Sequence, residues 1–553
     1  MKSMHLQLSA LAAAAALSAG SLAAARRGAA DVDSKVDRIF AKWTASTPGC
    51  AVAASVGGGP ALARAYGMAD LEHDVRNTAD TIFEAGSVSK QFTAAAVLLL
   101  ARDGKLSLDD PARTYIPELP QYGDPLTIRH MLNHTSGLRD WGSVAAIAGW
   151  PRTSRVYTHA HVLDIVGRQR ALNFTPGTRW SYSNTGYNLA AIIISRVSGT
   201  PFADFTRRRI FEPAGMSHTS WRDDHTRVVK GRAIAYVDGR DGFHTDMPFE
   251  DVHGNGGLLT TVGDLLKWNE HFGSPKIGDE AFVREQQQPG HFNDGRVHQY
   301  AFGLSVGTYK GLREVSHSGS TAGYTSFLTR FPDQRVSVAV LCNATSGQAT
   351  QYAHGVADVY LADRVKPAAV PAAVGVSDAD LDAVQGWYRS TQTGVPVQIV
   401  REKDGLRAGR TALVAVSATR FIVPNLQTWE IDGRARARVI DPFGSVETYE
   451  RVPPAKPGTA ELRALTGTYT SDEAETTFTA AMDGDALVLT RRPDTTVKLT
   501  PIYADGFDAG SLGFVVFRRD PSGVPDAFSI SEGRVWDLRF TRLKDNSRPR
   551  SQQ

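Results

Sequence analysis

The sequence predicts an α/β-type domain followed by two small antiparallel β-barrels. Residues 31–365 alternate between helical and strand-like segments with short breaks. An Ala/Pro/Val stretch over 366–375 has no amphipathic period and is typical of a linker. Beyond it, short alternating runs lie between Gly, Asp and Pro breaks, which indicates antiparallel β-structure. A chain of 553 residues is also too long for one core, so several domains are expected.

The N-terminus has the pattern of a secretory signal. Lys2 precedes an apolar run over residues 6–22, and small residues follow at 23–25. We therefore expect residues 1–25 to be a signal peptide and the mature protein to be periplasmic or secreted, with a retained membrane anchor as the alternative. No other stretch approaches the ~18 apolar residues that span a bilayer, so we expect no membrane span after signal removal.

The tail contains an internal repeat. Residues 381–388, Leu-Asp-Ala-Val-Gln-Gly-Trp-Tyr, align with residues 462–469, Leu-Arg-Ala-Leu-Thr-Gly-Thr-Tyr. Each copy is long enough for a closed sheet of about eight short strands. We predict a linker over 366–377 and barrels over 378–452 and 458–545. One larger barrel built from both copies is the alternative.

The charge balance excludes one class of partner. The formal net charge is +3, from 61 basic and 58 acidic residues, and no concentrated Lys/Arg patch occurs. Nucleic-acid binding needs such a patch. We expect a small-molecule or short-peptide substrate, with peptidoglycan fragments among the candidates, and no nucleic acid.

Two cysteines, Cys50 and Cys342, lie in strand-like runs. Export makes a disulfide between them chemically permissible. Buried free thiols are the simpler interpretation and the one we favour at this stage.

The most informative motif is Ser87-Val-Ser-Lys90, which leads into the apolar helical run 94–100. Three residues of separation place Ser87 and Lys90 on one helical face, one turn apart. A serine hydroxyl needs a neighbouring base to become a nucleophile, and an amine can act as one when burial lowers its pKa. The motif alone is common on solvated helix faces.

A second motif, Trp180-Ser-Tyr182-Ser-Asn184, precedes another apolar helix and follows the turn signal Thr-Pro-Gly177. A loop there can project a phenol and a carboxamide into a cleft. The phenol can relay a proton, and the amide can hold a substrate carbonyl. Otherwise, Tyr182 is an interface aromatic with a satisfied hydroxyl.

A third motif, His317-Ser-Gly319, lies in a strand-like segment. A glycine inside a strand allows close approach of another backbone, here that of a substrate. His317 can supply hydrogen bonding and partial positive charge to a substrate carboxylate or to a proton relay. A lone histidine is more often structural.

Together and in this order, the three motifs resemble those of the serine penicillin-recognising hydrolases: class C β-lactamases, DD-peptidases, D-aminopeptidases and related esterases. The resemblance covers about residues 35–350 and includes the segments 126–138 and 256–265. It implies an antiparallel five-stranded sheet flanked by helices, with an all-helical lobe and the site between them.

The resemblance also implies roles for individual residues. They are Ser87 as nucleophile, Lys90 as its partner in acylation, Tyr182 as proton-transfer phenol, Asn184 as ligand of the substrate amide, His317 and Gly319 on the opposing strand, and the backbone N–H groups of Ser87 and Ser320 as oxyanion hole. Because the strand reads His-Ser-Gly instead of Lys-Thr-Gly, a strong β-lactamase is not expected.

The double-barrel tail is similar to that of D-aminopeptidases, in which a loop of the last barrel reaches the site. If this holds, residues 503–510 are the candidate loop, and Asp505 or Asp508 could pair with a substrate's free amino group. The alternative is a solvated hairpin.

No metal or cofactor is expected. His130 and His134 are four residues apart, but no glutamate follows His130 as in a zinc protease motif. The pair His159 and His161 has no third ligand nearby in the sequence. Acyl transfer through a serine needs no cofactor.

Three functions compete. The first is an exported D-stereospecific peptidase or aminopeptidase, and the second is a short-chain esterase or weak β-lactamase with the same site. The third is a non-catalytic penicillin-binding or sensor protein. The complete set of Ser87, Lys90, Tyr182 and Asn184 favours an enzyme.

Overall fold

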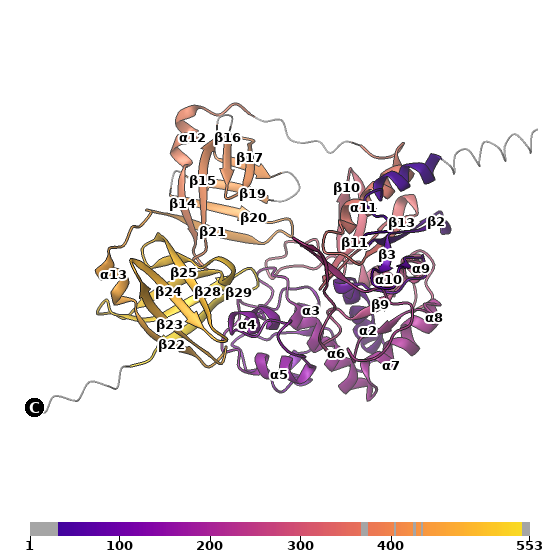
Figure 1. Ribbon diagram of the computed structural model, residues 1–553, viewed down its shortest axis with the longest axis horizontal. Helices are drawn as coiled ribbons and strands as arrows, with labels where there is room; N and C mark the ends of the chain where they lie inside the picture. Colours follow the sequence, from indigo (N-terminus) through magenta and orange to yellow (C-terminus); the bar gives the residue numbers. More distant parts are fainter. Residues whose placement is uncertain (1–30, 367–373, 403–404, 424–426, 433–434, 545–553) are drawn as a thin grey trace, which may run out of the picture.

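The structure is a computed structural model that describes residues 31–366, 374–402, 405–423, 427–432 and 435–544. A domain with a central sheet and helices is followed by two β-barrels (Figure 1). The predicted signal peptide lies outside the described residues, as does most of the predicted linker.

The central sheet is antiparallel and has the strand order β10-β11-β12-β13-β1-β2. Its strands are β1 (Cys50–Val56), β2 (Gly59–Tyr66), β10 (Ser305–Tyr309), β11 (Leu312–Thr321), β12 (Tyr324–Phe331) and β13 (Val336–Cys342). The sheet thus has six strands, not the five that the family resemblance implies. β10 extends the edge because Lys310 and Gly311, both with positive φ, form a two-residue turn that suits the strand twist.

Helices cover both faces of this sheet. Along β1, Ala51 and Ala53 belong to the apolar cluster that contains α2 and α6, whereas Val52 and Ala54 pack with α11 and the helical residues 31–39. The helices named here and α9 are α2 (Lys90–Arg102), α6 (Asn184–Ser198), α9 (Val262–His271) and α11 (Ala349–Leu361). This two-sided burial explains why β1 is apolar on both faces.

The chain between β2 and β10 forms the helical lobe and three small sheets. Its further helical elements are η1 (Gly86–Ser89), η2 (Ala112–Thr114), α3 (Ile128–Leu132), α4 (Trp141–Ile147), α5 (His159–Gly167), α7 (Phe202–Thr206), η3 (Arg207–Phe211), α8 (Glu212–Ala214) and α10 (Glu280–Gln286). The small sheets comprise β3 (Met68–Asp70) with β4 (Val75–Arg76), β5 (Phe83–Glu84) with β9 (Leu258–Thr260) and β6 (Ser220–Trp221), and β7 (Tyr236–Gly239) with β8 (Gly242–Thr245). α2 is buried from Lys90 to Leu100, as its apolar run predicts.

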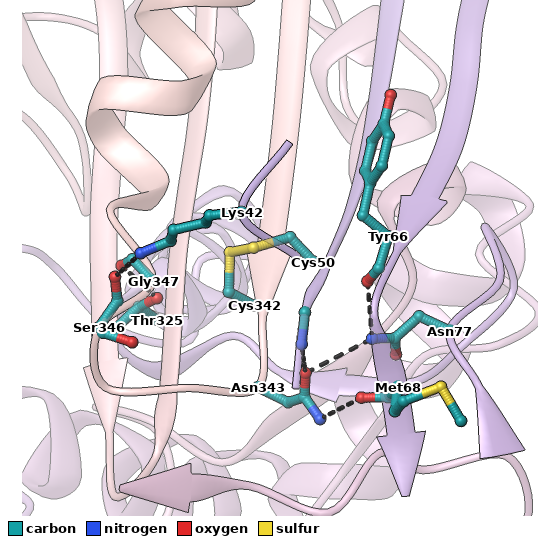
Figure 2. Close-up of a disulfide and its surroundings, with 11 residues drawn as sticks. Lys42, Cys50, Tyr66, Met68, Asn77, Thr325, Cys342, Asn343, Ser346 and Gly347 are labelled. Carbon is teal, nitrogen blue, oxygen red and sulfur yellow. Dashed lines mark hydrogen bonds between the residues drawn. A yellow bond between two sulfur atoms is a disulfide. The ribbon is translucent and has the colours of Figure 1, made fainter. Parts of the chain in front are cut away.

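Cys50 and Cys342 form a disulfide, so the expectation of free thiols is wrong. The pairing of β1 with β13 places the two residues directly opposite each other, at a Cα–Cα distance of 4.0 Å. Figure 2 shows the bond beside Asn343, whose side chain accepts from Gly49 N and donates to Met68 O. The disulfide therefore closes a loop between the first and last parts of the domain.

The tail forms two closed eight-stranded barrels, which confirms the two-barrel prediction over one larger barrel. Barrel 1 consists of β14 (Gly386–Ser390), β15 (Pro396–Glu402), β16 (Gly405–Ala408), β17 (Thr411–Ala415), β18 (Arg420–Val423), β19 (Gln427–Asp432), β20 (Arg436–Ile440) and β21 (Val446–Val452). Barrel 2 consists of β22 (Gly467–Ser471), β23 (Thr476–Asp483), β24 (Ala486–Arg491), β25 (Thr495–Tyr503), β26 (Gly506–Asp508), β27 (Phe514–Arg519), β28 (Pro525–Glu532) and β29 (Val535–Arg542). A short helix precedes each barrel, α12 (Asp378–Val384) and α13 (Thr459–Ala464). Within the described residues, every helix is too short or too polar to cross a membrane.

Candidate active site

Ser87 lies in η1, the single turn that leads into α2. Gly86 precedes it with φ +50°, a conformation that favours glycine, and a Cβ on Gly86 would lie 2.6 Å from Ser320 N. The turn places Ser87 Oγ 3.0 Å from Nζ of Lys90, the first residue of α2. The predicted pair is thus brought together.

Lys90 is fully buried, and burial together with the positive charge of Arg534 holds its pKa well below the usual range. Its Nζ also lies 2.9 Å from Asn184 Oδ1 and 2.8 Å from the Asn255 carbonyl oxygen. Nζ thus has three acceptors, and it donates to Ser87 Oγ as well as to these two oxygens. When the amine is neutral, its two N–H bonds can stay on the oxygens of Asn184 and Asn255, and its lone pair can accept from the Ser87 O–H.

Tyr182 lies in the loop before α6, and its ring centroid is 4.8 Å from Lys90 Nζ. Burial raises the pKa of Tyr182, partly offset by a hydrogen bond with the Ser87 side chain. Both shifts favour the uncharged forms, the protonated phenol of Tyr182 and the neutral amine of Lys90. Such a pair can supply a base at Lys90 and a phenol that passes a proton on.

Asn184 begins α6, and its backbone N–H donates to Asp140 Oδ2 at 2.8 Å. Asp140 is nearly buried and also caps α4 through Ser143 N. The Asn184 side chain is thereby fixed with its oxygen on Lys90. Its predicted role as ligand of a substrate amide stays a prediction.

His317 lies on β11 and lines the cavity, but it is neutral. Its Nδ1 donates to the Ser318 carbonyl oxygen, 2.6 Å away, and Tyr300 Oη donates to its Nε2 at 2.9 Å. Burial, with a contribution from Lys90, lowers the pKa of His317 to about 3. The expected partial positive charge is therefore wrong, because desolvation at this position outweighs any stabilisation of the imidazolium.

Gly319 is required by the protein's own backbone. A Cβ at this position would lie 2.1 Å from Ala85 O and 3.0 Å from Ser87 N. From the sequence, we expected Gly319 to allow close approach of a substrate backbone. In the structure, it allows β11 to approach the turn that carries Ser87. This approach brings the backbone around Ser320 and Ser87 together, as an oxyanion hole requires.

A cavity of about 1250 Å³ contains these groups. Ser87, Tyr182, Asn184, His317, Gly319 and Ser320 all line it, with Asn255, Arg152 and Arg534. It continues past Thr321 and Thr325 to α11, where His354 and Asp358 lie on its wall.

The segment 503–510 is not part of this cavity. Asp505 forms the β25–β26 turn and pairs with Arg519 of its own barrel at 2.7 Å, while Asp508 accepts from Gly510 N. Barrel 2 instead reaches the cavity through Arg534, in the turn between β28 and β29. This corrects the prediction that residues 503–510 reach the site. The β28–β29 turn, which carries Arg534, points at the catalytic domain instead.

Several residues at the site were not singled out from the sequence. Asn255 lies in Gly254-Asn-Gly-Gly257, a pattern whose glycines could have marked a close approach. Arg534 follows Gly533 between two strand-like runs, which indicates a hairpin turn but not its neighbour. Tyr300 carries no local signal, because only the fold brings it to His317.

The histidine pairs considered as metal ligands have other roles. His130 Nδ1 accepts from Thr127 N at the start of α3, and His161 Nδ1 accepts from Thr158 N at the start of α5. His134 packs against Tyr182, with ring centroids 4.3 Å apart. These contacts explain the spacing as helix capping and packing.

Comparisons with known proteins show which family the chain resembles. The family model described as Beta-lactamase matches residues 33–361. Penicillin-binding protein 4* of Bacillus subtilis is 30% identical over 308 residues, which cover 53% of this chain and 67% of that protein. The D-aminopeptidase of Brucella anthropi is 25% identical over 530 residues, covering 90% of this chain and 96% of its own.

Among solved structures, the octameric penicillin-binding protein homologue from Pyrococcus abyssi is similar in fold. The TM-score is 0.54 at 22% identity, and the likeness covers 76% of this chain and 99% of that one.

Proposed function

This chain belongs to the Beta-lactamase family and is a serine hydrolase, and we propose that it is a D-stereospecific peptidase or amidase that forms an acyl-enzyme on Ser87. One observation carries the proposal: the buried Lys90 Nζ lies 3.0 Å from Ser87 Oγ and has two further, carbonyl-type acceptors, Asn184 Oδ1 and the Asn255 carbonyl oxygen. A buried neutral amine in this position is a general base for the hydroxyl.

Acylation follows from these contacts. Ser87 Oγ attacks the substrate carbonyl carbon and gives its proton to Lys90, and the Ser87 and Ser320 N–H groups stabilise the oxyanion. The C–N bond then breaks, and Tyr182 passes a proton to the leaving amine while Lys90 reprotonates the phenol. In deacylation, water attacks the carbonyl carbon of the Ser87 ester and loses a proton to the pair formed by Lys90 and Tyr182. The C–O bond to Ser87 then breaks, the pair returns the proton to Ser87 Oγ, and the acid is released.

The choice of D-configured short peptides, including peptidoglycan fragments, rests on two supports. The D-aminopeptidase of Brucella anthropi aligns with 90% of this chain, so the similarity extends through both barrels. The cavity is long enough to continue from Ser87 to α11, which suits a peptide more than a small acyl ester.

The test is kcat/KM for D-alanine p-nitroanilide against the L-isomer, with Ser87→Ala and, as matched control, Ser195→Ala, whose hydroxyl donates to Ala191 O within α6. We expect a strong preference for the D-isomer that Ser87→Ala abolishes and Ser195→Ala retains. An acyl-enzyme on Ser87, trapped by acid quench and detected by mass spectrometry, is expected with the D-isomer. Turnover of p-nitrophenyl acetate alone would assign an esterase instead.

We also propose that the protein is exported to the periplasm or beyond. The N-terminal pattern supports export, and the Cys50–Cys342 bond suits an oxidising compartment. N-terminal sequencing of the protein from a periplasmic fraction tests this, and a mature chain that still begins at Met1 contradicts it.

A further inference from the structure

The charges around the cavity are unequal. Among the described residues that line it, Arg152 and Arg534 are cationic and Asp358 is the one carboxylate. Asp358 lies at the far end on α11 and accepts from Lys310 Nζ at 2.7 Å and from Tyr309 Oη at 3.1 Å. No described carboxylate lining this cavity is thus left for a substrate's ammonium group near Ser87.

The two arginines differ in how far their charge is already balanced. Arg152 Nε donates to Glu250 at 2.7 Å, and the Glu250 side chain is 4% exposed. Arg534 has a weaker partner: its Nη1 lies 3.9 Å from Asp140 Oδ2, and Asp140 also accepts from Ser143 N and Asn184 N. The guanidinium of Arg534 therefore remains able to bind an anion.

Arg534 is nevertheless held in place. Its carbonyl oxygen accepts from Asn173 Nδ2 at 3.0 Å and from Asp140 N at 3.3 Å. Its guanidinium carbon lies 4.8 Å from the centroid of the Tyr182 ring, so the cation stacks on the proton-transfer phenol. The side chain is 44% exposed, which leaves its outer N–H groups accessible from the cavity.

We propose that Arg534 makes the site selective for substrates that carry a carboxylate near the scissile bond and disfavours those that carry a free ammonium there. A guanidinium pairs with a carboxylate through two parallel hydrogen bonds, whereas an ammonium at the same place is repelled. The inference rests on the proposed peptidase function and narrows it, because it replaces recognition of a free N-terminus by recognition of an acid.

The experiment compares substrates that differ only in charge. D-alanine p-nitroanilide carries an ammonium, its N-acetyl derivative is neutral, and its N-succinyl derivative carries a carboxylate. We expect kcat/KM to increase by about tenfold at each step, the size of one charge interaction of this range in a partly solvated site. A second pair, N-acetyl-D-alanyl-D-alanine and its C-terminal amide, places the carboxylate on the leaving group instead.

Variants assign the preference to Arg534. Arg534→Glu is expected to reverse the order, Arg534→Gln to remove it, and Arg534→Lys to keep it in weakened form. Arg539→Gln is the matched control, since Arg539 is on β29, the strand that follows the Arg534 turn, pairs with Asp537 and lies outside the cavity lining. Equal kcat/KM across charges in the wild type, or an order that Arg534→Glu leaves unchanged in both pairs, overturns the proposal.

The two proposals can fail separately. If no D-amino acid amide is hydrolysed, the peptidase function fails, and p-nitrophenyl acetate and p-nitrophenyl hemisuccinate then report the charge preference through the same serine. A hemisuccinate preference that Arg534→Gln removes supports the anion site without the peptidase. A common rate for both esters overturns the anion site.

Discussion

The two barrels are copies of one repeat, and their equivalent turns meet the catalytic domain at the same loop. In both, the tyrosine of the repeat donates to a carbonyl four residues earlier: Tyr388 Oη to Val384 O at 2.9 Å, and Tyr469 Oη to Leu465 O at 2.8 Å. This shared contact joins the preceding short helix to the first strand of each barrel. The barrels therefore begin alike.

The last hairpins of the two barrels differ in the side chain that they place against the catalytic domain. The β20–β21 turn of barrel 1 stacks Phe443 on Trp180, with ring centroids 3.8 Å apart. The β28–β29 turn of barrel 2 places Arg534 over Tyr182, two residues further along the same loop. The equivalent turns of the two repeats thus contact the same loop of the catalytic domain. The residue at the tip of each turn determines whether that contact is an aromatic stack, as for Phe443, or brings a positive charge, as for Arg534.

The barrels also differ in how they are anchored. Barrel 2 holds the helical lobe through Arg139, which pairs with Glu473 at 2.5 Å and donates to Trp536 O. The two side chains are 3% and 12% exposed. Barrel 1 is held by the Phe443 stack, by Arg296, which donates to Gly444 O, and by hydrogen bonds of Ser445 and Gln392. Among the described residues these contacts include no ion pair, so we expect the turn that carries Arg534 to be fixed more firmly.

The largest effect on kcat/KM is expected from a substitution of Lys90 in the active site. Lys90→Met removes the base while keeping the volume of the chain, and kcat/KM should fall by about 10³-fold. The acetate ester and the D-amide should lose activity together. Lys42→Met serves as control, because Lys42 Nζ donates to Ser346 O at the surface. A loss below about tenfold would assign the base elsewhere.

The next prediction tests whether barrel 2 is anchored to the catalytic domain more firmly than barrel 1. Arg139→Ala leaves the Glu473 carboxylate buried without its partner, which costs about 3–5 kcal/mol. We expect a lower Tm and a loss of the charge preference, since the turn with Arg534 loses its support. Arg296→Ala, which removes the contact of the catalytic domain with Gly444 O of barrel 1, should change both quantities much less. Equal effects of the two variants would show that the barrels are anchored alike.

A perturbation remote from both turns sharpens the comparison. Replacing Cys50 and Cys342 by serine removes a cross-link between residues 292 positions apart, and we expect a loss of about 2–4 kcal/mol in unfolding free energy. Thermal unfolding of the variant and of the reduced wild type should agree. The ratio of kcat/KM between charged substrates should stay unchanged, so stability and selectivity separate.

The sequence predicted which residues lie together at the candidate site because the parts of the site are local motifs. Ser87 and Lys90 are one helical turn apart, and Tyr182 and Asn184 share one loop, so spacing alone relates them. The two barrels were predictable from a repeated octapeptide. What failed depended on contacts across the fold: the disulfide required the β1–β13 register, and the neutral state of His317 required its burial and the Tyr300 contact.

The loop of barrel 2 was assigned wrongly for a related reason. Both 503–510 and 532–535 are turn signals between strand-like runs, and nothing local distinguishes them. The choice depends on which of these turns contacts the helical lobe, and this follows from side-chain contacts such as those of Asn173 with Arg534 and Trp536.

The smallest expected effect is a change in pH dependence, and it distinguishes the two turns directly. In the proposed mechanism hydrolysis requires neutral Lys90, so kcat/KM should fall as the pH drops through the pKa of Lys90. The positive charge of Arg534 helps to lower that pKa, whereas Phe443 is uncharged. Arg534→Gln should therefore move the acidic limb of the profile for p-nitrophenyl acetate to higher pH. Phe443→Ala should lower the plateau by about two- to tenfold, through the lost aromatic contact, and leave the limb in place. A limb that moves with Phe443→Ala and not with Arg534→Gln would mean that the turns act on Lys90 by packing, and that the charge at the tip of barrel 2 does not reach the base.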